Sequence, residues 1–147
     1  MNYNYKFQKI LQLREQEKEE TESRYNDALK QFEQAAEKLY ALLKKKEDLI
    51  HFQEAKMVSG FSVHEIQHYQ LFISNLEQTI HYQQQVVINA RSKMQWHEQQ
   101  LRERSIEVKK YEKMKEKDFE RFKDQLLEDE QKHMDEISTI QFMNRKR

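Results

Sequence analysis

The chain contains one motif with the spacing of a zinc protease, H-E-x-x-H, at His64–His68. In that motif two histidines on one helix face bind zinc, and the glutamate acts as a general base. A working site also needs a third ligand and a fold that forms a cleft for the substrate. The remaining histidines form no second ligand cluster; they are His51, His81, His97 and His133. We therefore expect no metal, no cofactor and no catalytic residue, and we interpret the protein as a non-enzyme.

The composition indicates which kind of element carries this motif. The chain of 147 residues has no proline and a single glycine, and 35% of its residues are charged against 37% that are hydrophobic. Compact domains are usually closer to half apolar and one quarter charged. A chain this polar can bury only a narrow stripe along a helix, and the absence of proline leaves such a helix unbroken. The composition therefore predicts an elongated, all-α protein.

The charge balance restricts the class of partner. The 26 Lys and Arg residues are matched by 26 Asp and Glu residues, so the formal net charge is zero. No bulk field then favours nucleic acid or an anionic membrane surface. The first ten residues lack the apolar core of a signal peptide, and no window approaches the roughly 20 apolar residues that cross a bilayer. Together with the absence of cysteine, this predicts a soluble, cytoplasmic protein without direct membrane insertion.

A heptad repeat organises the first half of the chain. With Leu11 at position a, the a and d positions from Tyr25 to Leu49 form a seam that can be buried everywhere except at Lys46. Polar residues interrupt the same repeat nearer the N-terminus: Arg14, Lys18 and Thr21. The repeat then stops near Gly60, the residue that enters a left-handed conformation without steric cost.

A helix start follows the stop within a few residues. Ser62 with Glu65 three positions later forms a capping box, and Phe61 and Ile66 have the spacing of a hydrophobic staple. A connection this short makes two neighbouring helices antiparallel. The heptad resumes in the second half of the chain and slips by four residues near Lys115, which is a stutter.

These signals predict one domain over residues 1–147, a long antiparallel two-helix coiled-coil hairpin. The first helix is expected at about 4–57, the turn at about 58–61 and the second helix at about 62–142. Residues beyond about Lys115 find no partner in the first helix, so the second helix is expected to be longer and to overhang. An apolar face in this overhang must bind something, associate with itself or fray; it contains Phe119, Phe122 and Leu126.

The densest apolar segment follows the turn. Its seam positions are Tyr69, Ile73, Leu76 and Ile80, whereas Phe72 falls at position g beside the seam. The spacing alone allows two interpretations of Phe72. It is either an exposed aromatic of the kind that helix-in-groove recognition uses, or a ring that folds over the edge of the seam.

The sequence resembles the flagellar export protein FliJ family over essentially its whole length. Near the N-terminus the resemblance depends on residues of the segment Phe7–Arg14 and on the charged run Glu15–Glu20. It is most specific just after the turn, in the segment Tyr69–Glu77. The resemblance implies a two-helix coil similar to the stalk (gamma) subunit of rotary F1-type ATPases, in a component of the flagellar type III export apparatus.

The resemblance also implies partners. The paired chain ends of family members enter the hexameric ring of the export ATPase, FliI, and the ring-binding residues expected here are Phe7, Leu11, Phe119, Phe122 and Leu126. A second contact is made with the cytoplasmic domain of the export gate protein, FlhA, and the corresponding residues are Phe72, Leu76, Thr79 and Gln83. Thr79 and Gln83 depart from the small residue and the histidine of some relatives. Family members are also described as escorts for export chaperones.

These partners place the protein in the cytoplasm, peripherally associated with the inner face of the cell membrane through the export apparatus. Its expected role is to help couple ATP hydrolysis to protein export. The alternative is an unrelated coiled-coil scaffold that associates with itself through the C-terminal overhang.

Overall fold

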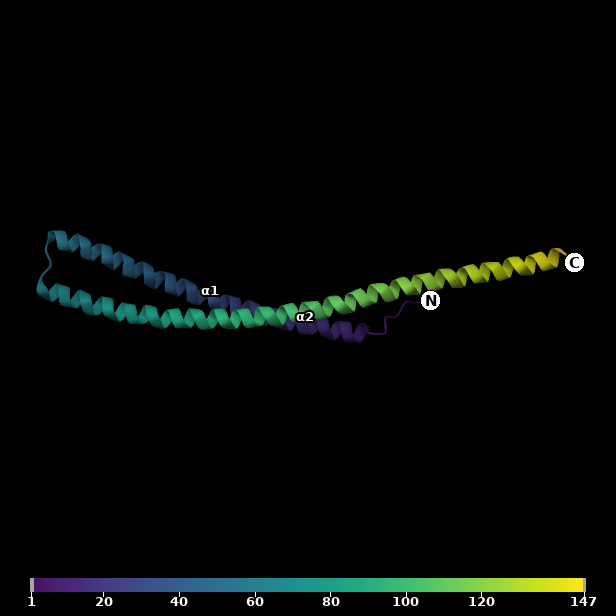
Figure 1. The fold of residues 1–147 in the computed structure, drawn as a ribbon, viewed down its shortest axis with the longest axis horizontal. Coiled ribbons are helices and arrows are strands. Elements are labelled where there is room, and N and C mark those ends of the chain that lie inside the picture. The colour runs from purple at the N-terminus through teal and green to yellow at the C-terminus, as the bar shows by residue number, and fades with distance from the viewer. Residues whose placement is uncertain (1, 147) are drawn as a thin grey trace. The chain divides into compact units, whose positions relative to one another are not determined.

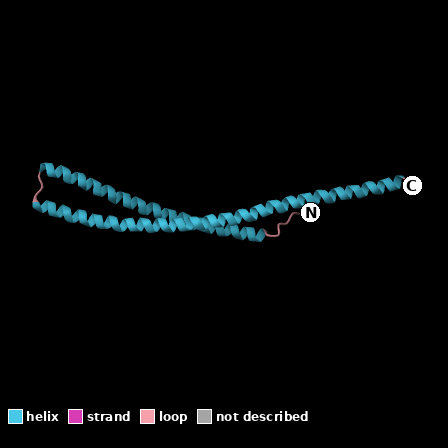
Figure 2. Cartoon of the chain, in the orientation of Figure 1, coloured by secondary structure: helices cyan, strands magenta, loops and turns pink. Residues whose placement is uncertain are grey.

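Two long helices account for nearly all of the computed structural model, which describes residues 2–146. Helix α1 covers Gln8–Ser59 and has 52 residues, and α2 covers Val63–Arg145 and has 83 residues (Figure 1). No strand occurs among the described residues, and the only segments outside the helices are the turn and the chain ends (Figure 2). The predicted all-α helical hairpin with a longer second helix is confirmed. No helix within residues 2–146 is long and apolar enough to cross a membrane.

The helix pair divides into two packing units, residues 20–102 and residues 2–19 with 103–146, and each is described separately. In the first unit the seam is built from small and branched residues at heptad spacing: Ala28, Ala35, Leu76 and Ile80. Leu49 on α1 faces Tyr69 on α2, whose hydroxyl donates to the Leu49 carbonyl at 3.1 Å. The same unit also buries two polar side chains, those of Thr21 and Gln83.

The turn between the helices consists of three residues, because α1 ends at Ser59 and α2 begins at Val63. Gly60 has φ of 106°, and its N–H donates to the Lys56 carbonyl at 2.8 Å, which closes the last turn of α1. The hydroxyl of Ser62 accepts from the Glu65 N–H at 3.1 Å, as an N-cap residue does. This pair of end signals sets where the chain reverses.

The second unit begins with a segment that is not helical. Residues 2–5 have no regular secondary structure, residues 6–7 form a turn, and α1 starts only at Gln8, later than the expected start near residue 4. Tyr5, Leu11 and Val108 form the buried core of this unit. An extended residue covers about 3.3 Å against about 1.5 Å in a helix. The N-terminal segment therefore reaches further along α2 than a helix of the same length would.

The expectation that residues beyond about Lys115 lack an internal partner is wrong for this reason. The Tyr3 hydroxyl donates to the Asp118 carboxylate at 2.8 Å, and the Tyr3 ring lies 5.0 Å from that of Phe119 and 5.3 Å from that of Phe122. From Leu127 to Lys146 every described residue is exposed. The fully exposed part of α2 thus begins at Leu127.

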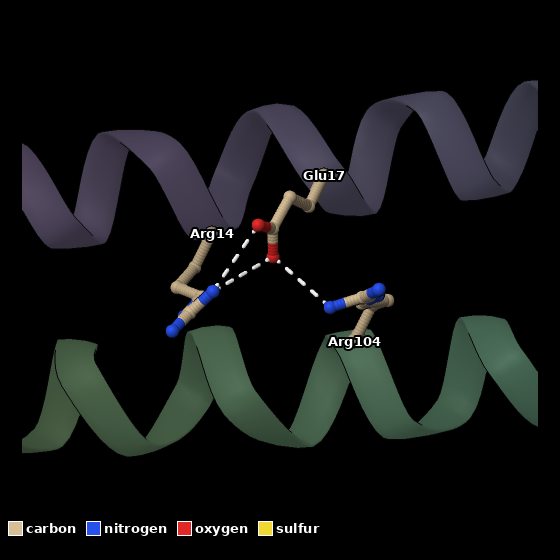
Figure 3. Close-up of polar contacts among 3 residues, drawn as sticks. All are labelled: Arg14, Glu17 and Arg104. Atoms are coloured by element: carbon tan, nitrogen blue, oxygen red, sulfur yellow. Dashed lines mark hydrogen bonds and ion pairs between the residues drawn. The ribbon is translucent and has the colours of Figure 1, made fainter.

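Arg14, one of the polar residues that interrupt the heptad, belongs to a charged layer in this unit (Figure 3). Both oxygens of the Glu17 carboxylate accept from Nη1 of Arg14, at 3.1 and 3.0 Å, and one of them also accepts from Nη1 of Arg104 at 3.0 Å. The hydrogen bond to Glu17 raises the pKa of Arg14. Two arginines therefore share one carboxylate across the helix pair.

Replacing Gly60 by alanine tests the turn. A Cβ at this position would meet nothing within 4 Å, so the only cost is the positive φ. We expect Gly60→Ala to lower the free energy of unfolding by about 1 kcal/mol in a urea titration. Gly60→Asn should lower it less, because asparagine tolerates positive φ better. Equal stability of the wild type and Gly60→Ala would contradict the turn geometry.

Candidate functional site

An apolar groove lies at the end of the helix pair that carries the turn. It encloses about 410 Å³ and is lined by Leu49, Phe52, Lys56, Phe61, His64, Glu65, His68, Tyr69 and Phe72. These residues come from α1, from the turn and from the first turns of α2. Grooves of this size and lining are typical of sites that receive apolar side chains or small apolar ligands.

Local packing positions the aromatic walls of the groove. The Phe61 ring, placed by the turn, meets the Tyr69 ring edge-on with centroids 6.2 Å apart. The hydrogen bond to the Leu49 carbonyl fixes the other end of Tyr69. Burial, with a smaller contribution from the Glu54 carboxylate, raises the pKa of Tyr69. Tyr69 is thus fixed between the two helices with its hydroxyl protonated.

Phe72 forms the outer wall and is exposed. Its relative exposure is 47%, and the ammonium group of Lys45 lies 5.3 Å from the ring centroid. Of the two interpretations left open by the heptad, the structure therefore favours the exposed aromatic. Phe52 on α1 is similarly open, with 53% exposure. Sequence reasoning missed Phe52 as a site residue, because the groove that it lines together with Phe72 forms only when both helices come together.

The structure does not bring the four expected gate residues onto one exposed surface. Leu76 is 7% exposed and Gln83 is 3% exposed, because both occupy seam positions of the heptad. The side-chain amide of Gln83 donates to the Ala35 carbonyl at 3.0 Å. Thr79 is exposed, and its hydroxyl donates to the Asn75 carbonyl within α2. Only Phe72 and Thr79 are therefore accessible, while Leu76 and Gln83 support the helix pair from inside.

The two histidines of the H-E-x-x-H motif line the same groove. Their rings lie edge-on, with centroids 5.4 Å apart. Between them in sequence, Glu65 points a carboxylate oxygen to within 3.9 Å of the Lys56 ammonium group. Among residues 2–146, no three His, Cys, Asp or Glu side chains gather as a metal site would require. The motif contributes polar edges to an apolar groove.

A second aromatic cluster lies at the chain ends. Of the expected ring-binding residues, Leu11 is 3% exposed and Phe7 packs partly buried against it. The rings of Phe119 and Phe122 both pack against the Tyr3 ring, and Phe119 keeps 39% exposure. Leu126 is partly exposed one turn further on.

Sequence reasoning missed the role of Tyr3 in that cluster. The alternation of apolar and polar residues in Tyr3–Phe7 is the signal of an extended segment, and it was available in the sequence. Tyr5 follows the same alternation, and its hydroxyl donates to the Tyr111 carbonyl at 3.1 Å. The predicted first helix, which begins at about residue 4, includes most of these residues instead.

The geometry defines the class of the protein: a coiled-coil hairpin with one aromatic groove at its turn and one aromatic cluster at its chain ends. The family model described as "Flagellar FliJ protein" matches residues 3–147. A protein of Bacillus subtilis (strain 168) with the same description is 48% identical over 146 residues, which cover 97% of each chain. The chain belongs to the FliJ family. The interpretation as an unrelated scaffold is therefore wrong, and no solved structure matches the chain significantly.

The Tyr3 anchor yields a prediction for alkaline solution. Burial, followed by the hydrogen bond to Asp118, raises the pKa of Tyr3 from 10.0 to about 12. Because the folded pKa lies above the unfolded one, the stabilising contribution of the anchor is complete below pH 10. It is lost as the pH rises toward 12.

Tyrosinate absorbance measured against pH checks this expectation. Tyr3→Phe should remove a late-ionising step, and Asp118→Asn should move that step to lower pH. The account of the anchor fails if neither variant changes the late part of the titration.

Proposed function

We propose that the protein is a non-enzymatic component of the flagellar type III export apparatus that binds both the export ATPase ring and the export gate. The observation that carries this proposal is Phe72, an exposed aromatic on an apolar groove, in a chain of the FliJ family. By linking two partners, the hairpin helps couple ATP hydrolysis to export.

The gate contact is assigned to the groove at the turn. Aromatic residues in a pocket supply most of the binding energy in many interfaces, and Phe72 is the exposed residue of the expected gate set that lines this pocket. Thr79 lies further along α2 and extends the contact as a polar neighbour. Leu76 and Gln83 contribute indirectly, because they hold the seam that presents Phe72.

The ring contact is assigned to the chain ends. Phe7 and Leu11 hold the N-terminal segment against α2, so their role is to shape this end. Phe119, Phe122 and Leu126 border the stretch of α2 that has no internal partner. Exposed apolar side chains continue along that stretch: Leu127, Met134, Ile140, Phe142 and Met143. A helix end of this kind suits insertion into the channel of a ring.

Both contacts on one chain allow the two partners to influence each other. If binding of one partner changes the affinity of the hairpin for the second partner, binding of the second changes the affinity for the first by the same factor. Binding to these partners also places the protein in the cytoplasm, at the inner face of the cell membrane. The same exposed surfaces can serve export chaperones, and no role in nucleic-acid binding is proposed.

Replacing Phe72 tests the gate contact. We expect Phe72→Ala to weaken binding of the gate's cytoplasmic domain by about tenfold or more and to leave ring binding unchanged. Leu71→Ala is the matched control, since Leu71 is 62% exposed but does not line the groove. Titration calorimetry on the purified proteins measures both affinities. Unchanged gate affinity in Phe72→Ala would rule out this assignment.

Two further variants separate binding from folding. Leu76→Ala should lower the free energy of unfolding by about 2 to 5 kcal/mol, because it empties a buried seam position. A chain that ends after Phe122 should keep its gate affinity and lose ring affinity. Retention of full ring affinity by the shortened chain would refute the chain-end assignment.

A further inference from the structure

The aromatic cluster at the chain ends is partly covered by the N-terminal segment, residues 2–7. The Tyr3 ring lies 5.0 Å from the Phe119 ring and 5.3 Å from the Phe122 ring. The Tyr3 hydroxyl donates to the Asp118 carboxylate at 2.8 Å. Tyr3 therefore occupies a site on α2 that offers two aromatic rings and one carboxylate. We call the three α2 residues together the Tyr3 site.

Tyr3 is attached less firmly than Tyr5, the other tyrosine of this segment. Tyr5 is 6% exposed and belongs to the buried core of the unit, whereas Tyr3 is only partly buried. The backbone hydrogen bonds described for residues 2–7 lead to Gln8 and Leu11, and none leads to α2. Terminal residues that only side chains attach separate more readily than residues of a packed core. Tyr3 can thus leave α2 while Tyr5 stays in place.

A hollow beside the Tyr3 site shows that the segment does not cover α2 completely. It encloses about 270 Å³ between residues 5–7 and α2, and Asp118 lines it. The Asp118 carboxylate is therefore accessible from the hollow as well as from Tyr3. Three cations line the same hollow: Lys6, Lys117 and Arg121. They repel a further cation, so a neutral donor suits this carboxylate better than an ammonium group.

We propose that the Tyr3 site is a docking site for an aromatic side chain of the export ATPase ring that carries a neutral hydrogen-bond donor. In the free protein Tyr3 occupies this site in place of the ring side chain. The inference rests on the proposed ring contact at the chain ends, which includes Phe119 and Phe122. Tyr3 and a partner side chain cannot pack on the same surface of both rings at once. Binding to the ring therefore displaces Tyr3.

The exchange explains how an apolar cluster can be covered in the free protein and still serve a partner. An incoming aromatic side chain replaces the ring contacts that Tyr3 gives up, and its donor replaces the hydrogen bond to Asp118. Contacts of one kind are lost and contacts of the same kind are gained. The apparent affinity for the ring is reduced only by the fraction of molecules in which Tyr3 occupies the site.

Replacing Tyr3 tests the competition. Tyr3→Ala should raise the affinity for the assembled ring by about tenfold, because two ring contacts and one hydrogen bond no longer oppose binding. Tyr3→Phe should raise it less, since only the hydrogen bond is lost. Tyr40→Ala is the matched control, because Tyr40 lies on α1 and is 69% exposed. Titration calorimetry measures the affinities, and circular dichroism verifies that each variant folds.

Distances between spin labels test the displacement itself. The chain has no cysteine, so Asn2→Cys and Lys109→Cys place one label on the N-terminal segment and one on α2, both at exposed positions. Addition of the ring should broaden the distribution of distances between them. A second pair, Lys9→Cys with Lys109→Cys, should keep its distribution, because Lys9 lies on α1. An unchanged distribution for the Asn2 pair in the ring complex would overturn the proposal.

The affinities separate failure of this inference from failure of the proposed function. A lower ring affinity in Tyr3→Ala would make Tyr3 part of the ring contact, and an unchanged affinity would show that Tyr3 does not compete. Either result overturns the displacement. If the chain that ends after Phe122 still loses ring affinity, the chain-end assignment survives that result. If the shortened chain keeps full ring affinity, the assignment and the displacement both fail.

Discussion

The seam between two antiparallel helices is the constraint on which the rest of this molecule depends. Two helices can bury only one stripe each, so every side chain outside that stripe faces water. In residues 20–102 the stripe narrows to alanine at Ala28 and Ala35, and this leaves space for the buried amide of Gln83. The exposed position of Phe72 follows directly, because it lies beside the same stripe. A third helix would have covered it.

The main features of the fold could be predicted because they follow from local periodicity. The heptad predicts which residues of each helix are buried, and Gly60 with Ser62 predicts where the chain reverses. The non-helical start of the chain at residues 2–7 was missed, because five residues of alternating pattern compete with strong helix propensity around them. The contact of Tyr3 with Phe122 was missed for the same reason, because a helix over the same residues would end further from Phe122.

The candidate site was predictable only in part. The heptad phase marked Phe72 as exposed, but the same phase places Leu76 and Gln83 in the seam, and the resemblance alone had grouped all four gate residues as a surface. The groove could not be derived from either helix separately, because Phe52 lies on α1, Phe72 on α2 and Phe61 in the turn between them. A net charge of zero likewise gives no information about how charges are arranged locally. The total charge is a sum over the whole chain, so it gives no sign of the charged layer around Glu17.

A cysteine pair across the seam tests the central claim most directly, because the chain has no cysteine of its own. Ala35→Cys with Gln83→Cys should form an intramolecular disulfide under mild oxidation, since both positions are buried and in contact. Ala35→Cys with Tyr82→Cys should remain reduced, because Tyr82 is 69% exposed and points away from the seam. Rapid disulfide formation by the Tyr82 pair, with none by the Gln83 pair, would contradict the seam and the exposed position of Phe72 that follows from it.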